Sequence, residues 1–189
     1  MLRLTVLMLP LMMLYTCLMG QGTGSSTVFW DQLSSHCGKA YEGTLMTPAE
    51  NDPFSGQKLV MHVVDCGEGF IHIPFFVGED KSRTWVLTKE NGLIKLKHDH
   101  RHADGTEDQV TQYGGTSTNS GMPGMQFFPA DQETAELIPH ASANVWWITL
   151  DETSFTYNLR RIGTDRFFSV KFDLTREVES PGPAWGWEK

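Results

Sequence analysis

From Lys39 to about residue 174, apolar and polar residues alternate with a period of two, and the alternating segments stop at Gly, Asn, Asp or Pro. This pattern is typical of β-strands joined by tight turns. It predicts strands at 39–46, 57–65, 68–76, 82–89, 92–102, 107–114, 124–130, 144–151, 153–161 and 165–174. Only 28–37 and 132–142 have the pattern of short helices. We therefore expect an all-β fold, a single antiparallel up-and-down barrel of about ten strands, because closure removes the exposed edges of a sheet.

Two turns predict which side chains of the middle strands face the interior. A two-residue turn at Asn91-Gly92 places Trp85 opposite His98, and one at Asp104-Gly105 places the later histidines on the same face. The inner face predicted in this way mixes aromatic and polar residues, namely Arg83, Trp85, His98, His100, His102, Glu107, Gln109 and Tyr113. The alternate residues, expected to face solvent, are Lys95, Lys97, Asp99 and Arg101.

The C-terminal strands predict a second, apolar wall. Turns at Glu152-Thr153 and Gly163-Thr164 set the register of three consecutive strands. The residues that then share the inner face are mostly aromatic, and include Trp146, Ile148, Phe155, Tyr157 and Phe172. The predicted interior is thus polar on one side and apolar on the other.

This interior suggests a site for a small amphipathic anion. The Arg83 guanidinium, the imidazoles and the Gln109 amide are mostly hydrogen-bond donors, and arginine can hold a carboxylate or phosphate with two bonds. The polar end of the ligand would contact Arg83 and the three histidines, with Glu107 and Gln109 orienting them, while its apolar body lies on Trp146 and Tyr157. The sequence therefore favours a small-molecule binding protein, and it contains no G-x-S-x-G motif that would indicate a nucleophile.

Two alternatives use the same residues differently. Histidines two apart on a strand can converge on one ion, so His100, His102 and Glu107 are candidate ligands of a divalent metal in a metal-binding protein or metal-dependent hydrolase. The nearby Arg83 charge disfavours a cation there. Haem ligation by one histidine stays open. The second alternative is a structural or interaction barrel with a packed interior, which would lack a pocket of roughly 300 Å³ or more.

The ends of the chain suggest export. Residues 1–20 resemble a secretory signal peptide, being too short in their apolar run to span a membrane. The alternative is a lipoprotein signal over 1–16 that leaves a lipid anchor on Cys17. We expect a flexible linker at 21–27, the barrel at 28–178 and a loosely ordered tail at 179–189. The expected location is the periplasm, the outer membrane as a lipoprotein, or the extracellular space.

The net charge excludes some classes of binding partner, and the cysteine content allows a disulfide. A net charge of −8 argues against binding nucleic acid or an anionic membrane, so any membrane contact would run through the lipid. Cys37 and Cys66 are the two cysteines beyond the leader, and in an oxidising compartment they either form a disulfide or stay as free thiols. Oligomeric state is not indicated by the sequence.

Five strings carry a family resemblance, spread from about Phe29 to Val178: "IPFFVGEDKSRTWVLT", "LKHDHRHADGTEDQVTQYGG", "FPAD", "NVWWITL" and "FDLTREV". In them the chain resembles a family of uncharacterised exported bacterial proteins. The resemblance implies export but no activity, substrate or site residue. The likeness to lipocalins and fatty-acid-binding proteins is one of expected fold alone, and a shared fold does not specify function.

Overall fold

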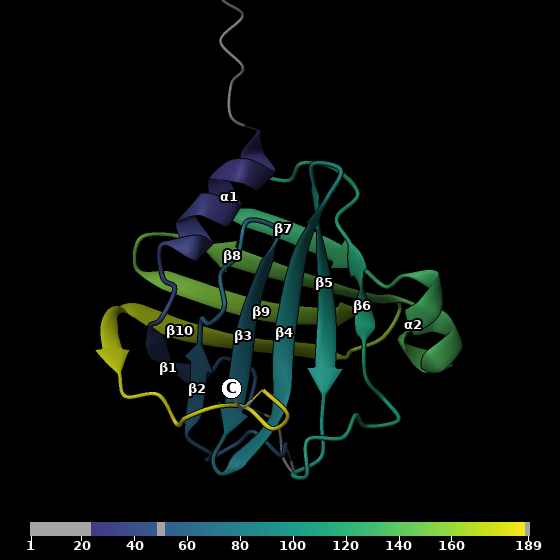
Figure 1. Ribbon diagram of the computed structural model, residues 1–189. Helices are drawn as coiled ribbons and strands as arrows, with labels where there is room; N and C mark the ends of the chain where they lie inside the picture. Colours follow the sequence, from purple (N-terminus) through teal and green to yellow (C-terminus); the bar gives the residue numbers. More distant parts are fainter. Residues whose placement is uncertain (1–23, 49–51, 188–189) are drawn as a thin grey trace, which may run out of the picture.

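The computed structural model describes residues 24–48 and 52–187, and within them the chain forms one nearly closed, barrel-shaped antiparallel sheet (Figure 1). Its strands are β1 (Ala40–Leu45), β2 (Leu59–His62), β3 (Phe70–Val77), β4 (Asp80–Glu90), β5 (Leu93–His100), β6 (Tyr113–Thr116), β7 (Met125–Pro129), β8 (Asn144–Leu150), β9 (Ser154–Arg161) and β10 (Phe167–Val178). The helices are α1 (Ser25–Ser34), α2 (Gln132–Leu137) and a single 3₁₀ turn, η1 (Pro139–Ala141). The expected all-β barrel with short helices is confirmed.

The strands follow one another around the barrel in chain order, as expected of an up-and-down meander. The sheet order is β6-β5-β4-β3-β2-β1-β10-β9-β8-β7, so β1 pairs with both β2 and β10 and the two free edges are β6 and β7. These edges approach closely, because the Asp131 N–H donates to the Gly114 carbonyl at 2.9 Å. A Cβ added to Gly115 would lie 1.7 Å from the Pro129 carbonyl oxygen. The absence of a side chain at Gly115 therefore allows the two edges to approach at this seam.

Three of the four turns gave the correct register. Trp85 pairs with His98, as the Asn91-Gly92 turn predicts, and both turn residues have the positive φ of such hairpins, 52° and 79°. The C-terminal hairpins are also confirmed, with Tyr157 paired to Ile148 on one side and to Val170 on the other.

The fourth turn was predicted wrongly. The chain reverses through a three-residue loop, in which the His102 N–H donates to the Thr106 carbonyl at 2.8 Å and Gly105 has φ of 83°. The Asp104 carboxylate accepts from both the N–H and the hydroxyl of Thr106, which favours the longer loop. The register therefore moves by one residue, and Arg101 rather than His102 lies opposite Glu107. The strand expected at 107–114 is also wrong, because after the Arg101–Glu107 bridge the pairing resumes only in β6, where His98 lies opposite Tyr113.

One residue expected to face solvent is buried instead. Asp99 is 1% exposed on the outer side of β5, where it accepts hydrogen bonds from Arg101, Gln112 and Trp187. The cover comes from the end of the chain, which lies along the outside of the sheet past β2 and β3 (Figure 1). Ala184 is buried in this contact. The expectation of a loosely ordered tail did not anticipate these contacts.

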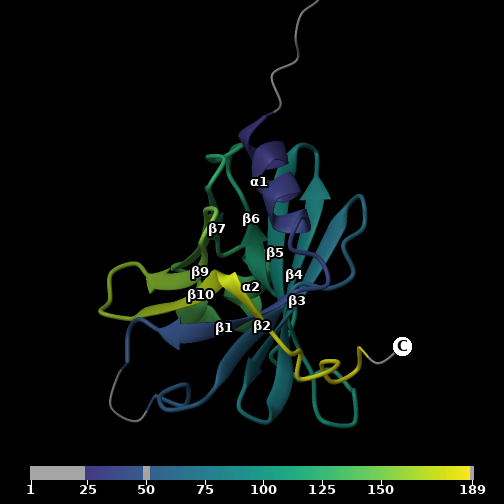
Figure 2. The same cartoon turned by 90° about the vertical axis from the view of Figure 1, so that its left-hand side faces the viewer.

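Helix α1 covers one end of the barrel (Figures 1 and 2). Its residues Phe29, Trp30 and Leu33 are buried in the main core. The helix begins at Ser25, three residues earlier than expected, so it includes part of the predicted linker. The proposed leader, Cys17 and residues 21–23 of that linker lie outside the described residues. No helix in the described ranges is long and apolar enough to cross a membrane.

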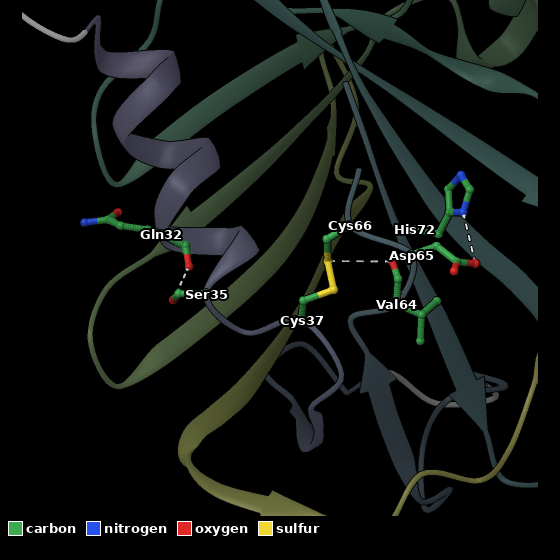
Figure 3. Close-up of a disulfide and its surroundings, with 7 residues drawn as sticks. All are labelled: Gln32, Ser35, Cys37, Val64, Asp65, Cys66 and His72. Carbon is green, nitrogen blue, oxygen red and sulfur yellow. Dashed lines mark hydrogen bonds and ion pairs between the residues drawn. A yellow bond between two sulfur atoms is a disulfide. The ribbon is translucent and has the colours of Figure 1, made fainter. Parts of the chain in front are cut away.

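A disulfide joins the chain after α1 to the connection between β2 and β3 (Figure 3). It links Cys37 to Cys66, the pair left open between a disulfide and two thiols. The bond fixes the segment that leads from α1 into β1. It lies toward the end of the barrel covered by the helix.

Candidate functional site

The inward-facing residues of the strands form layers along the barrel axis. Successive inward residues on a strand lie about 6.5 Å apart, because side chains alternate between the two faces. On β4 these residues are Arg83, Trp85 and Leu87, and on β9 they are Arg161, Leu159, Tyr157 and Phe155. On β5 they are His100, His98 and Leu96, and on β8 they are Asn144, Trp146 and Ile148. From one end inward, the barrel changes from polar to aromatic to apolar.

A pocket of about 410 Å³ occupies the polar and aromatic part of this interior, at the end away from α1. Its walls combine aromatic rings with charged and polar groups. The lining residues include Phe54, Phe75, Arg83, Trp85, His98, His100, Asp108, Tyr113, His140, Asn144, Trp146, Tyr157, Leu159, Arg161, Arg166 and Phe168. The deeper residues Leu87, Leu96, Ile148 and Phe155 are not among its described lining residues.

Aromatic rings in contact with one another close the inner end of the pocket. Trp85 stacks on Phe75, with ring centroids 4.9 Å apart, and on Tyr157, at 4.3 Å, with interplanar angles of 16° and 14°. His98 stacks on Tyr113 at 4.6 Å and 11°. We call these five residues (Phe75, Trp85, His98, Tyr113 and Tyr157) the floor.

His98 joins the two parts of the floor through both ring nitrogens. Nδ1 lies 2.9 Å from the Tyr113 carbonyl oxygen, and Nε2 lies 2.6 Å from the Tyr157 hydroxyl. A carbonyl only accepts, so Nδ1 carries the proton and Nε2 accepts from Tyr157. Burial lowers the pKa of His98 to about 3, which keeps the ring neutral. His98 therefore holds the floor together and has no free nitrogen for a ligand.

Three guanidinium groups surround the opening of the pocket. We call Arg83, His100, Asp108, Arg161 and Arg166 the rim. Arg83 forms an ion pair with Asp80, and its guanidinium carbon lies 5.5 Å from the centre of the Phe54 ring. These two contacts fix the Arg83 guanidinium in the lining of the pocket.

The other two arginines of the rim have no carboxylate partner among the described residues. Arg161 donates from Nε to the Asn144 side-chain oxygen at 2.9 Å, and its terminal nitrogens have no hydrogen-bond partner within the described ranges. Arg166 lies in the turn between β9 and β10 and lines the same pocket. The sequence reasoning missed both. The parity that places Leu159 inside also places Arg161 inside, so the signal for that residue was available.

His100 and Tyr113 form a second hydrogen-bonded pair on the polar side. The Tyr113 hydroxyl lies 3.0 Å from His100 Nε2. Burial, and then the Arg83 charge, lower the pKa of His100, whereas burial raises the pKa of Tyr113 to about 12. Both groups are therefore neutral near pH 7, and the positive charge of the rim comes from its arginines.

The structure brings together seven of the ten residues predicted for the site. Arg83, Trp85, His98, His100, Tyr113, Trp146 and Tyr157 all line the pocket. His102, Glu107 and Gln109 do not, because the three-residue loop leaves them exposed. Glu107 instead lies 3.3 Å from the Arg101 guanidinium on the outer side.

The candidate metal site is not assembled. His102 and Glu107 are exposed on the loop, whereas His100 faces the pocket. No group of three or more His, Cys, Asp or Glu side chains that could hold a metal ion occurs within residues 24–48 and 52–187. The register shift at Asp104-Gly105 is the physical reason, since it separates the three residues expected to converge.

Comparison of the chain with protein-family models, with curated proteins and with solved structures gave no match. Any functional statement therefore depends on the geometry of the pocket itself.

Proposed function

We propose that this protein is an exported binding protein that holds a small organic anion in its barrel. The observation that supports this most directly is that three arginines surround the opening of an aromatic pocket. A volume of about 410 Å³ lies in the range of small-molecule sites. The apolar body of the ligand would pack on the aromatic walls, and its anionic group would lie at the rim.

The charge distribution supports an anion over a neutral or cationic ligand. The whole chain has a net charge of −8, yet the pocket lining has three arginines against one carboxylate, Asp108. Asp80, which is not among the described lining residues, forms an ion pair with Arg83 and offsets the charge of that arginine. Arg161 and Arg166 remain available for charge-assisted hydrogen bonds to a carboxylate, sulfate or phosphate oxygen.

The pocket also bears on the packed-interior alternative. Its volume exceeds the roughly 300 Å³ below which a barrel would hold no drug-sized ligand. The polar groups at its opening do not all pair with one another, since two guanidinium groups, those of Arg161 and Arg166, lack a carboxylate partner among the described residues. Binding of an anion would provide these two arginines with a partner, whereas a packed interior would not.

Calorimetric titration with three probes of equal carbon number tests the proposal. 2-Naphthoate is a ring-bearing anion, undecanoate is a linear anion, and 2-naphthalenemethanol is the neutral counterpart of the first. At least one carboxylate should bind, and if it is 2-naphthoate, at least tenfold tighter than the alcohol. Absence of binding by both carboxylates, or equal binding of 2-naphthoate and the alcohol, would overturn the proposal.

A pair of double variants then locates the anion. Arg161→Gln with Arg166→Gln should weaken binding of the carboxylate at least tenfold, because each lost charge-assisted bond contributes about 1.5–3 kcal/mol. The matched control is Arg160→Gln with Arg176→Gln, which makes the same change in net charge at exposed arginines outside the pocket. Equal losses in the two double variants would show that the site is elsewhere.

A further inference from the structure

The floor limits how far a ligand can enter the barrel. Phe75, Trp85 and Tyr157 belong to β3, β4 and β9, so their parallel rings extend from one wall to the opposite one. The Tyr157 hydroxyl is hydrogen-bonded to His98. His98 in turn is stacked on Tyr113, which completes a layer of contacts across the interior.

The space beyond the floor is filled by the protein itself. Leu87, Leu96, Ile148 and Phe155 are each 0% exposed in the layer below it. Further along the axis, Phe29 and other side chains of α1 close that end. Since protein interiors are close-packed, a long flexible chain has no path past the floor.

Further aromatic rings line the walls above the floor. Phe54 lies 4.9 Å from Phe168 and stacks over Phe75 at 6.0 Å, with an interplanar angle of 17° for the second pair. Trp146 lines the opposite wall. Aromatic rings prefer offset-stacked or edge-to-face partners at centroid distances of about 4.5–7 Å, so a flat ring system is well suited to this space.

We infer that the ligand is a compact, ring-bearing organic anion, such as an aromatic carboxylate or sulfate, and not a long-chain fatty acid. This inference rests on the proposed function and specifies the ligand class of the same pocket. The ring system packs against the aromatic side chains of the floor and walls, while the anionic group contacts Arg161 and Arg166. The pocket is short because its floor is closed.

Comparing 2-naphthoate with undecanoate tests this directly, because the two carboxylates have the same charge and the same number of carbon atoms. We expect the dissociation constant of 2-naphthoate to be at least tenfold lower. Undecanoate binding equally well or better would overturn the ring preference and leave the proposed function standing. Absence of binding by both would remove the proposed function itself.

A floor variant shows where the ring lies. Trp85→Leu should weaken 2-naphthoate binding at least tenfold and undecanoate binding much less, so that the ratio of the two dissociation constants falls toward one. Leu159→Ala, which shortens a non-aromatic lining residue, is the control and should preserve the ratio.

Contacts between naphthoate protons and the Trp85 ring, measured by nuclear Overhauser effects in the native protein, provide a readout that does not depend on either variant folding. Their absence from a saturated complex would place the ring elsewhere and overturn the inference.

Discussion

The indole N–H of Trp187 donates to a carboxylate oxygen of Asp99 at 2.8 Å, although the two residues are 88 positions apart. Trp187 also lies over His72, with ring centroids 4.3 Å apart, and under the Arg101 guanidinium. Asp99 lies between the pocket residues His98 and His100 in sequence but on the opposite face of β5. The tail thus contacts the strand that supplies part of the pocket wall.

Asp99 also organises the loop between β5 and β6. The Gln112 amide donates to the Asp99 carboxylate at 2.9 Å and the Thr111 hydroxyl donates to it at 3.3 Å. Arg101, which also donates to Asp99, donates a second hydrogen bond to the Gly105 carbonyl. That loop contributes Asp108 and Val110 to the pocket lining. A buried carboxylate on the outside of the sheet therefore holds one side of the opening in place.

Replacing the donor should measurably weaken the fold. Trp187→Phe keeps an aromatic ring but leaves the buried Asp99 carboxylate with one partner fewer, at an expected loss of about 1–2 kcal/mol in the free energy of unfolding. Urea denaturation monitored by circular dichroism measures this. Trp185→Phe is the matched control, because it makes the same chemical change in the same tail. Equal losses in both variants would mean that the hydrogen bond to Asp99 contributes nothing specific.

The parts of the fold that were predictable depend on local turn chemistry. Asn91-Gly92 tolerates positive φ at both positions, so the two-residue turn and the register of β4 against β5 follow from those residues alone. Asp104-Gly105 was ambiguous, because an Asp before a Gly suits both a two-residue and a three-residue loop. Only the bonds from Thr106 to Asp104 distinguish them, and the one-residue difference places Arg101 instead of His102 opposite Glu107.

The parts that could not be predicted depend on contacts distant in sequence. The alternation pattern assigns Asp99 to the outer face, which is correct, but it does not indicate that the tail covers that position. Arg166 belongs to a turn, where period-two parity does not apply, so the alternation pattern does not indicate that it lines the pocket. The candidate site was thus predictable along regular strands and unpredictable in loops.

His98 should make stability depend on pH in the acid range. Its pKa is about 3 in the folded protein, whereas the ordinary pKa of histidine is 6.5, so between these two pH values the unfolded chain binds a proton that the folded protein does not. The free energy of unfolding therefore falls as the pH is lowered below about 6.5, by up to about 1.4 kcal/mol per pH unit from this residue. His98→Gln should reduce the slope of unfolding free energy against pH by about one proton between pH 4 and 6.

A spectroscopic measurement supports the histidine prediction. Nitrogen-15 spectra of the native protein should show His98 protonated at Nδ1 and not at Nε2 down to about pH 4. A ring that titrates near pH 6 would contradict the assignment, even if the His98 variant failed to fold.

The seam between β6 and β7 gives the sharpest test of barrel closure. A methyl group at Gly115 would lie 1.7 Å from the Pro129 carbonyl oxygen, which is backbone and cannot rotate away. Gly115→Ala should therefore lower the free energy of unfolding by at least about 2 kcal/mol, because the seam must open to accept the added atom. Gly69→Ala is the matched control, since a Cβ there meets nothing within 4 Å, and its stability should change by less than about 1 kcal/mol. Urea denaturation of both variants measures the difference. If Gly115→Ala is as stable as its control, the two edges do not approach as closely as the structure shows, and the pocket wall formed by Tyr113 beside this seam would have to be redrawn.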